Sequence, residues 1–447
     1  TTGTGNTFVG GLAGDAVTTS ADNTAVGYQA LTTSTTAANN TAVGVSALKL
    51  TTTGANNTAV GRGALLANTT GTVNVAVGTS ALTANTTASY NTALGYAALS
   101  TNITGAQNTA VGYSALTLAT GADNTAVGSQ ALASVAAGTF NTALGRSAGQ
   151  GVTTGNDNVA LGYLALNLNT ASNRNVAVGS EALKTLNVTS DTHVYNTAVG
   201  YATGTAVTTG VQNTFIGGLA GAAITTGNNN TAIGYGALAS AAESGNTAVG
   251  QSALIACTDV NNTAVGDNAG FNVTEGTQNT LIGAQVEAEA ADSNNCIGLG
   301  FNIVAGAGYT TLGVDASDIR AAHGTATWAA VSDQRYKKDI TDSTAGLSFI
   351  NALQPRTWNY RTLGELPETF RAYEAGSTEV FKNTQTNHGF IAQEVKAAID
   401  ADDSLKDGFR LWDDREDGSQ EVAEAALIPI LVKAIQELTA RITTLEG

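Results

Sequence analysis

The fold is decided by the sequence Asn23-Thr24-Ala25-Val26-Gly27, because close variants of this phrase recur along most of the 447-residue chain. Seventeen copies follow one another at spacings of 16 or 17 residues, with one spacing of 21, before the pattern decays near Asn295. Such a short fixed period is typical of a solenoid whose units stack on their neighbours, and the unit is too short for two helices. The Asn residues that mark the copies are Asn6, Asn23, Asn40, Asn57, Asn74, Asn91, Asn108, Asn124, Asn141, Asn158, Asn175, Asn196, Asn213, Asn230, Asn246, Asn262 and Asn279.

Each copy predicts one short β-strand with two apolar faces. Ala25 and Val26 are adjacent, and neighbouring side chains of a strand point to opposite faces. One face fills the interior of the coil, while the other leaves an apolar stripe of a kind that soluble monomers rarely expose. We therefore expect identical chains to cover the stripe. Gly27 suits a tight corner with positive φ, and the repeated Asn can stack into an amide ladder along the axis.

The repeats resemble the left-handed parallel β-roll heads of trimeric autotransporter adhesins over roughly residues 1–300. Those heads also combine Asn, small apolar residues and a closing Ile/Val-Gly. The resemblance implies a mainly β fold with a trimeric parallel β-roll or β-solenoid shaft, and the repeats of this sequence, about 17 residues long, are somewhat longer than those of the adhesin heads. If every copy is one coil at an interstrand spacing of about 4.7 Å, some 18 coils extend roughly 85 Å.

The composition argues against several functional classes. A net charge of -16 disfavours a nucleic-acid groove, which depends on clustered Lys and Arg. Cys257 and Cys296 lie in different repeats and are too few for a disulfide framework, so we interpret them as small buried hydrophobic residues. No apolar run approaches the roughly 20 residues that span a bilayer, so we expect no membrane insertion. The repeats carry no nucleotide or calcium motif, and we predict no cofactor and no metal site.

The distribution of charge divides the chain into two regions of different composition. The first 325 residues contain 6 basic and 15 acidic side chains, whereas the last 122 contain 13 and 20. We expect a repetitive shaft at residues 1–300, a connector at 301–331 and a separate domain at 332–447. Within that domain, a C-terminal helix is expected at 424–446.

Three ordered blocks mark the C-terminal domain. They are Ser-Asp-Gln-Arg-Tyr-Lys-Lys-Asp-Ile from Ser332, Leu-Gln-Pro-Arg-Thr-Trp-Asn-Tyr from Leu353, and His-Gly-Phe-Ile-Ala-Gln-Glu-Val from His388. With the terminal helix, they resemble the intramolecular chaperone autoprocessing family found at the C-termini of phage endosialidases, neck appendages and tail fibres. The resemblance implies a small α+β chaperone domain that templates trimer assembly of the upstream fibre and then cuts itself off.

The same resemblance assigns a Ser-Lys dyad by motif position, with Ser332 as the nucleophile and Lys337 as the general base. The cleaved bond would lie next to Ser332, most simply Val331-Ser332, and each chain would act once as its own serine endopeptidase. A Lys serves as a base only if burial or neighbouring cations lower its pKa from about 10.4, and Arg335 and Lys338 are near in sequence. The spacing alone leaves an alternative, in which Ser332 is a helix N-cap and Lys337 a solvated charge.

The end of the chain carries a heptad seam with Glu and Lys outside it. Apolar residues alternate at spacings of three and four, which predicts association of chains through this helix. Ile and Leu at these positions favour two strands in model peptides, but the seam is short and we expect the rest of the domain to impose a trimer. The seam residues are Ile428, Leu431, Ile435, Leu438, Ile442 and Leu445.

The main functional hypothesis is a homotrimeric viral tail-fibre protein of phage type, located in the virion. Its expected partners are a host-surface receptor, either a glycan or a protein, and upstream virion or fibre proteins. The alternative is an extracellular or cell-surface trimeric adhesin whose C-terminal domain only trimerises. A glycan-cleaving enzyme is disfavoured, because the shaft's scattered carboxylates show no pair at catalytic spacing in one repeat. Those carboxylates include Asp15, Asp22, Asp123 and Asp157.

Overall fold

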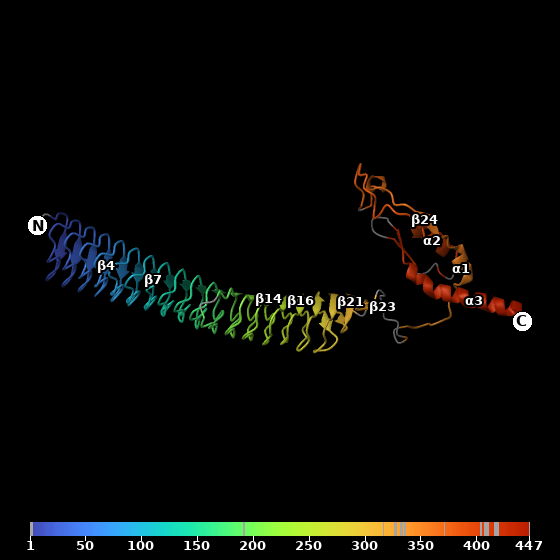
Figure 1. Ribbon diagram of the computed structural model, residues 1–447, viewed down its shortest axis with the longest axis horizontal. Helices are drawn as coiled ribbons and strands as arrows, with labels where there is room; N and C mark the ends of the chain where they lie inside the picture. Colours follow the sequence, from blue (N-terminus) through green and yellow to red (C-terminus); the bar gives the residue numbers. More distant parts are fainter. Residues whose placement is uncertain are drawn as a thin grey trace. The chain divides into compact units, whose positions relative to one another are not determined.

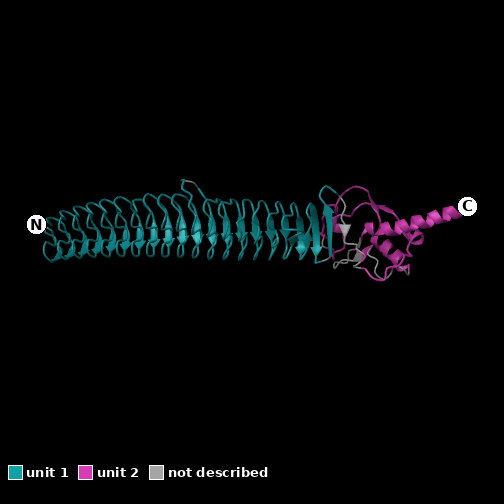
Figure 2. Ribbon diagram, turned by 90° about the horizontal axis from the view of Figure 1, so that it is seen from below, with its two compact units in different colours: residues 1–331 teal, residues 332–447 magenta. Residues whose placement is uncertain are grey.

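The computed structural model describes residues 3–190, 193–315, 317–325, 329–330, 334, 337–370, 372–402, 405, 411–414 and 420–446. The chain divides into two compact units, residues 1–331 and 332–447 (Figure 2). The first unit is a row of stacked coils, and the second contains the helices α1, α2 and α3 (Figure 1).

Each coil of the shaft contributes one three-residue strand to a long parallel sheet. Consecutive strands pair in register, so that Thr24 lies opposite Thr41, Ala25 opposite Ala42 and Val26 opposite Val43. The strands are β1 (Thr7–Val9), β2 (Thr24–Val26), β3 (Thr41–Val43), β4 (Thr58–Val60), β5 (Val75–Val77), β6 (Thr92–Leu94), β7 (Thr109–Val111), β8 (Thr125–Val127), β9 (Thr142–Leu144), β10 (Val159–Leu161), β11 (Val176–Val178), β12 (Thr197–Val199), β13 (Thr214–Ile216), β14 (Thr231–Ile233), β15 (Thr247–Val249), β16 (Thr263–Val265) and β17 (Thr280–Ile282). The predicted parallel β-solenoid with about 17-residue coils is confirmed.

The interior of the shaft is built from small and branched apolar side chains. In the second coil, Ala25, Ala30 and Leu31 are fully buried, and the equivalent residues of the following coils continue the same core. Leu31 reaches this position with φ of 52°, in the left-handed region that ordinary residues avoid at a cost of about 1–2 kcal/mol. Burying the Leu side chain returns about 1.5–3 kcal/mol, so the strained backbone is tolerated in coil after coil.

The predicted amide ladder is present and runs through buried positions. In Asn57 the backbone N–H donates to Asn40 Oδ1 at 2.9 Å, and its side-chain Nδ2 donates to the same oxygen at 3.2 Å. Nδ2 of Asn57 also donates to the carbonyl of Gly71 at 2.9 Å. One Asn per coil thereby satisfies polar groups of its own and of neighbouring coils that water cannot reach. This explains why the repeat keeps Asn at a fixed position.

The sheet changes character at the C-terminal end of the shaft. The parallel ladder continues past residue 300 through β19 (Ile297–Phe301) into β21 (Tyr309–Val314), beside a small pair of β18 (Glu287–Ala288) and β20 (Val304–Ala305). Then β22 (Ser317–Ala322) pairs antiparallel with β21, and β23 (Ala329–Ala330) pairs antiparallel with β22. The stretch expected as a connector therefore contains strands that extend the sheet of the solenoid.

The second unit is small and mixes helices with short hairpins. Its elements are α1 (Leu347–Ala352), β24 (Arg356–Trp358), η2 (Leu363–Glu365), β25 (Asn387–Gly389), α2 (Ala392–Asp400), β26 (Trp412–Asp414), β27 (Gln420–Val422), η3 (Glu424–Leu427) and α3 (Ile428–Glu446). Its buried core joins Phe349 of α1, Ile399 of α2 and Ile430 of α3. The predicted small domain ending in a helix is confirmed. Among the helices that the structure describes, none is long and apolar enough to cross a membrane.

Candidate functional site

The predicted dyad falls only partly within the described structure. Ser332 and Val331 lie outside the described residues, whereas Lys337 is exposed and its backbone N–H donates to the carbonyl of Gln334 at 2.9 Å. The structure gives no distance between the two members of the dyad, and their catalytic roles stay a prediction.

The second and third sequence blocks meet in one antiparallel pair of strands, and the third block continues into helix α2. Strand β24 pairs with β25, so that Thr357 lies opposite His388. Arg356 at the start of β24 forms a two-pronged ion pair with Glu394 of α2, with Nε and Nη2 at 2.9 and 2.8 Å from the carboxylate oxygens. The Arg356 hydrogen bonds, and then its charge, lower the pKa of Glu394. This pair links the two blocks through residues that are 38 positions apart in the sequence.

Helix α3 has one buried face and one exposed apolar face. Ile430 and Ala434 are buried in the second unit, and Glu437 accepts a hydrogen bond at 3.0 Å from the backbone N–H of Leu347, at the start of α1. The predicted seam lies elsewhere on the helix. Its six residues are between 42% and 87% exposed, and Val432 beside them is 50% exposed. The single chain thus uses one face of α3 for its own core and leaves the seam uncovered.

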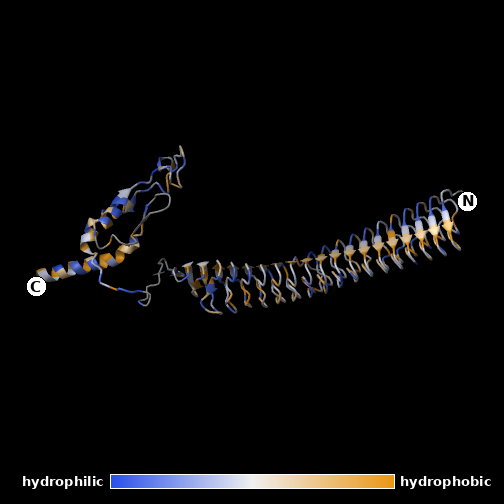
Figure 3. Cartoon of the chain, turned by 180° about the vertical axis from the view of Figure 1, so that it is seen from behind, coloured by the Kyte–Doolittle hydropathy of each residue, from blue (hydrophilic) through white to orange (hydrophobic). Residues whose placement is uncertain are grey.

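The outward face of the shaft carries the predicted stripe. The middle residue of each strand from β2 to β17 is buried, whereas the first and third residues are half-buried or exposed. The third position is always Val, Leu or Ile in β1 to β17, and Leu94 and Leu144 are 47% and 50% exposed. No charged residue occupies the first or third position of these strands. The hydropathy colouring shows apolar residues along the row of strands (Figure 3).

Exposed tyrosines form a second feature of the shaft surface that the sequence reasoning did not single out. They follow the corner glycine of six coils and are between 44% and 63% exposed. Tyr96 and Tyr113 in adjacent coils stack with ring centroids 5.5 Å apart. The sequence already contains the pattern that marks them, which is a Tyr that recurs directly after the corner glycine. The six are Tyr28, Tyr96, Tyr113, Tyr163, Tyr201 and Tyr235.

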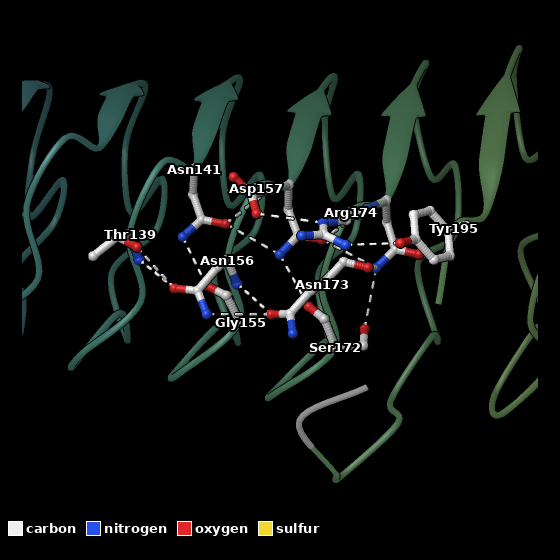
Figure 4. A network of polar contacts seen from close by, with 11 residues as sticks. Thr139, Asn141, Gly155, Asn156, Asp157, Ser172, Asn173, Arg174 and Tyr195 are labelled. Carbon is white, nitrogen blue, oxygen red and sulfur yellow. Dashed lines mark hydrogen bonds and ion pairs between the residues drawn. The ribbon is translucent and has the colours of Figure 1, made fainter. Parts of the chain in front are cut away.

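A polar chain spans the coils next to the one spacing of 21 residues (Figure 4). Arg174 lies 3.7 Å from the Asp157 carboxylate and donates to the Tyr195 hydroxyl at 2.7 Å. An outer amide ladder runs beside it, in which the backbone N–H of Asn156 donates to Asn173 Oδ1 at 2.6 Å. Because these groups satisfy one another across consecutive coils, we interpret the cluster as a staple that holds the irregular coil in register.

The two cysteines are buried, as the sequence predicted. Cys257 and Cys296 are both free and buried, and burial raises the pKa of each thiol. Among the described residues, no group of three or more His, Cys, Asp or Glu side chains is arranged to hold a metal ion.

Comparison with known proteins identifies one region. Residues 332–403 match the family model described as chaperone of endosialidase. No curated protein and no solved structure matches the chain. No relative therefore supports the adhesin-like identity of the shaft repeats. The solenoid is assigned from the parallel pairing of its strands. The chain joins a parallel β-solenoid to a C-terminal segment of the endosialidase-chaperone type.

Proposed function

We propose that this chain is a subunit of a homotrimeric, phage-type tail fibre whose C-terminal unit templates assembly and then releases itself. The observation that carries the proposal is the order of the two parts. A long solenoid is followed directly by a segment that matches the endosialidase chaperone model. A chaperone placed after a repetitive shaft can gather the chains before the shafts zip together.

Two uncovered apolar surfaces support the association of chains. The seam of α3 exposes Ile435 and Ile442 by 61% and 52%, which is costly for an isolated helix in water. The stripe of the shaft repeats the same side chains once per coil in an in-register ladder. A partner with the same repeat can match it along its whole length, and another copy of this chain has that repeat.

The proposed release is a single hydrolysis of the Val331-Ser332 peptide bond. The Ser332 hydroxyl attacks the Val331 carbonyl carbon while the neutral amine of Lys337 accepts the hydroxyl proton. The C–N bond then breaks, the proton passes to the departing Ser332 nitrogen, and Val331 is left as an ester on the hydroxyl. Water hydrolyses this ester, which yields the Val331 carboxylate and restores the hydroxyl. No oxidant, metal or cofactor is required.

The released fibre would present the shaft to a host-surface receptor and would attach to upstream virion or fibre proteins. The exposed tyrosines suit a receptor with sugar rings, because an aromatic face packs well on apolar C–H groups while its hydroxyl bonds to polar ones. The alternative function is a cell-surface trimeric adhesin with a C-terminal unit that never cleaves. The exposed α3 seam supports trimerisation equally in both functions.

The test is intact mass and denaturing gel analysis of freshly purified wild type, Ser332→Ala and Lys337→Ala, with Lys382→Ala as a control for loss of one exposed Lys far from the dyad in sequence. We expect fragments of 331 and 116 residues, set by cleavage after Val331, in wild type and Lys382→Ala only. An intact wild-type chain would remove the protease and favour the adhesin. Cleavage that persists in Ser332→Ala would assign the reaction to another nucleophile.

A further inference from the structure

We infer that the shafts of the assembled fibre lie head to tail around its axis, so that the strand ends of one chain meet the strand starts of the next. The inference rests on the proposed homotrimer and names the edges through which its chains meet. Two rows of side chains define these edges. The start row consists of the residue directly before the ladder Asn of each coil, and the end row of the residue directly after the corner glycine.

Both rows carry exposed aromatic side chains and border the apolar stripe. Around β6, Tyr90 of the start row is 62% exposed and Tyr96 of the end row is 55% exposed. Around β12, Tyr195 and Tyr201 are 47% and 63% exposed. Large aromatic side chains at both ends of one strand widen the apolar area beyond the stripe, and soluble monomers seldom leave such an area in water. The face that needs a partner therefore extends from one row across the strand to the other.

The direction of the strands determines which rows can meet. Consecutive strands pair in register, as Thr92 does with Thr109, so each strand runs across the shaft rather than along it (Figure 4). The stripe repeats once per coil, so a second copy covers its whole length only when the two chains are parallel and level. Rotation about an axis along the shaft satisfies this condition, and all strands then run the same way around that axis. The start row of one chain accordingly meets the end row of its neighbour, coil by coil.

The two rows are complementary when residues of the same coil are compared. Arg146 of the end row is level with Phe140 of the start row, which pairs a cation with an aromatic ring. Asp157 is level with Tyr163, whose hydroxyl can donate to the carboxylate. No coil carries like charges in both rows, and an antiparallel pair of chains would lose these matches. The other charged members also have uncharged polar or aromatic partners, which are Asp22 with Tyr28, Asn56 with Arg62, Asp123 with Ser129, Arg174 with Ser180, and Asn261 with Asp267.

Contacts along each row order these side chains within the single chain. In the end row, the guanidinium of Arg146 lies 5.8 Å from the ring centroid of Tyr163 in the next coil. In the start row, the guanidinium of Arg174 lies 5.6 Å from the ring centroid of Tyr195 and donates to its hydroxyl at 2.7 Å. Side chains that are already ordered lose little conformational freedom on association, which favours binding. Both edges are therefore prepared for a partner that presents the opposite row.

The test is chemical cross-linking of the purified full-length chain with a short bis-maleimide. The double variant Tyr90→Cys/Tyr96→Cys places one thiol in each row of the same coil, and we expect covalent species of up to three chains on a denaturing gel. Either single variant should give only single chains, because neither row meets itself. The matched control is Tyr90→Cys/Tyr163→Cys, whose second thiol lies four coils away, about 19 Å along the shaft at an interstrand spacing of about 4.7 Å. Wild type gives the background from the buried Cys257 and Cys296.

The outcomes separate the inference from the proposed function. Cross-linking of Tyr90→Cys alone would place the start row against itself and overturn the inference. A double variant that is trimeric by light scattering but remains unlinked would also overturn it, as would equal linking in the matched control. If the double variant does not assemble, Gln107→Cys/Tyr113→Cys tests the same pairing in the next coil. A wild type that is monomeric by light scattering rejects the proposed homotrimer itself, which is a different result from a trimer whose two rows do not meet.

Discussion

Asn40 and Asn57 are joined by two hydrogen bonds to a single oxygen, since the backbone N–H and the side-chain Nδ2 of Asn57 both donate to Asn40 Oδ1, at 2.9 and 3.2 Å. Both residues are almost completely buried. The same relationship links most neighbouring coils, and it makes each coil depend on the next for the satisfaction of its polar groups.

Replacing one ladder residue should therefore destabilise the shaft strongly. In Asn57→Ala, the backbone N–H of Asn74 loses its acceptor and the Gly71 carbonyl loses one of its two side-chain donors, both in buried surroundings. We expect a loss of about 2–4 kcal/mol in the free energy of unfolding, measured by urea denaturation. The control is Asn56→Gly, an exposed neighbour whose left-handed φ of 59° glycine can adopt. Equal stability of the two variants would mean that the ladder is not a main source of stability.

The corner glycine gives a second prediction on the same coils. Gly27 has φ of 136°, and a Cβ added there would lie 2.6 Å from the backbone oxygen of Gly44 in the next coil. Gly63 also has positive φ, but a Cβ there would meet its nearest neighbour, Leu66, at 3.9 Å. Alanine is strained at both positive φ values, by about 1–2 kcal/mol in the left-handed region that Gly63 adopts. We expect Gly27→Ala to lower the thermal midpoint well beyond Gly63→Ala, because only the first also separates two coils. Similar midpoints would contradict this reading.

The amide ladder and the corner glycine could be predicted from the repeat, whereas the features that depend on tertiary contacts could not. An amide at a constant period has its equivalent in the next coil as its natural partner, and a glycine at a constant corner points to a special φ. The left-handed φ of Leu31 was not predictable, because the local preference of Leu opposes it and burial decides the outcome. Strands β22 and β23 were missed because they lie outside the period and were assigned to a connector.

In the C-terminal unit too, features set by local spacing could be predicted from the sequence, and contacts between distant residues could not. The seam of α3 follows from spacing alone, since helical geometry places residues three and four apart on one face. The Arg356–Glu394 pair joins two blocks that the sequence already marked, but no spacing rule connects residues 38 positions apart. The dyad of Ser332 and Lys337 was assigned by resemblance to a family, because no periodic pattern in the sequence relates these two residues.

The Arg356–Glu394 pair predicts a small loss of folding stability at acidic pH. The partner lowers the folded-state pKa of Glu394 below its unfolded value of about 4.3, so the contribution is fully present above that pH and is lost as pH falls through the folded pKa. Both side chains are exposed, so the effect on stability is modest. The direct measurement is an NMR titration of the Glu394 carboxyl. We expect its pKa to rise in Arg356→Gln and to stay unchanged in Arg361→Gln, which removes an equal charge elsewhere. No rise in Arg356→Gln would show that the pair does not persist in solution.

The exposed seam of α3 gives the last prediction, on assembly. Ile435 is 61% exposed in the single chain, so a charge there costs the isolated subunit little, whereas it would be buried between helices in a trimer. We expect Ile435→Lys to shift the mass measured by light scattering from trimer towards monomer, with an unchanged helical signal in circular dichroism. The matched control is Gln436→Lys, an exposed neighbour outside the seam, which should remain trimeric.

The possible outcomes of this comparison have different physical explanations. A trimeric Ile435→Lys protein with intact α3 would show that the seam is dispensable and that the stripe of the shaft alone joins the chains. If both variants become monomeric, the loss reflects added positive charge on the helix rather than the seam. A monomeric Ile435→Lys protein that also fails to form ordered shafts, beside a normal Gln436→Lys, is the result expected of a chaperone that must gather three chains before the coils can pair.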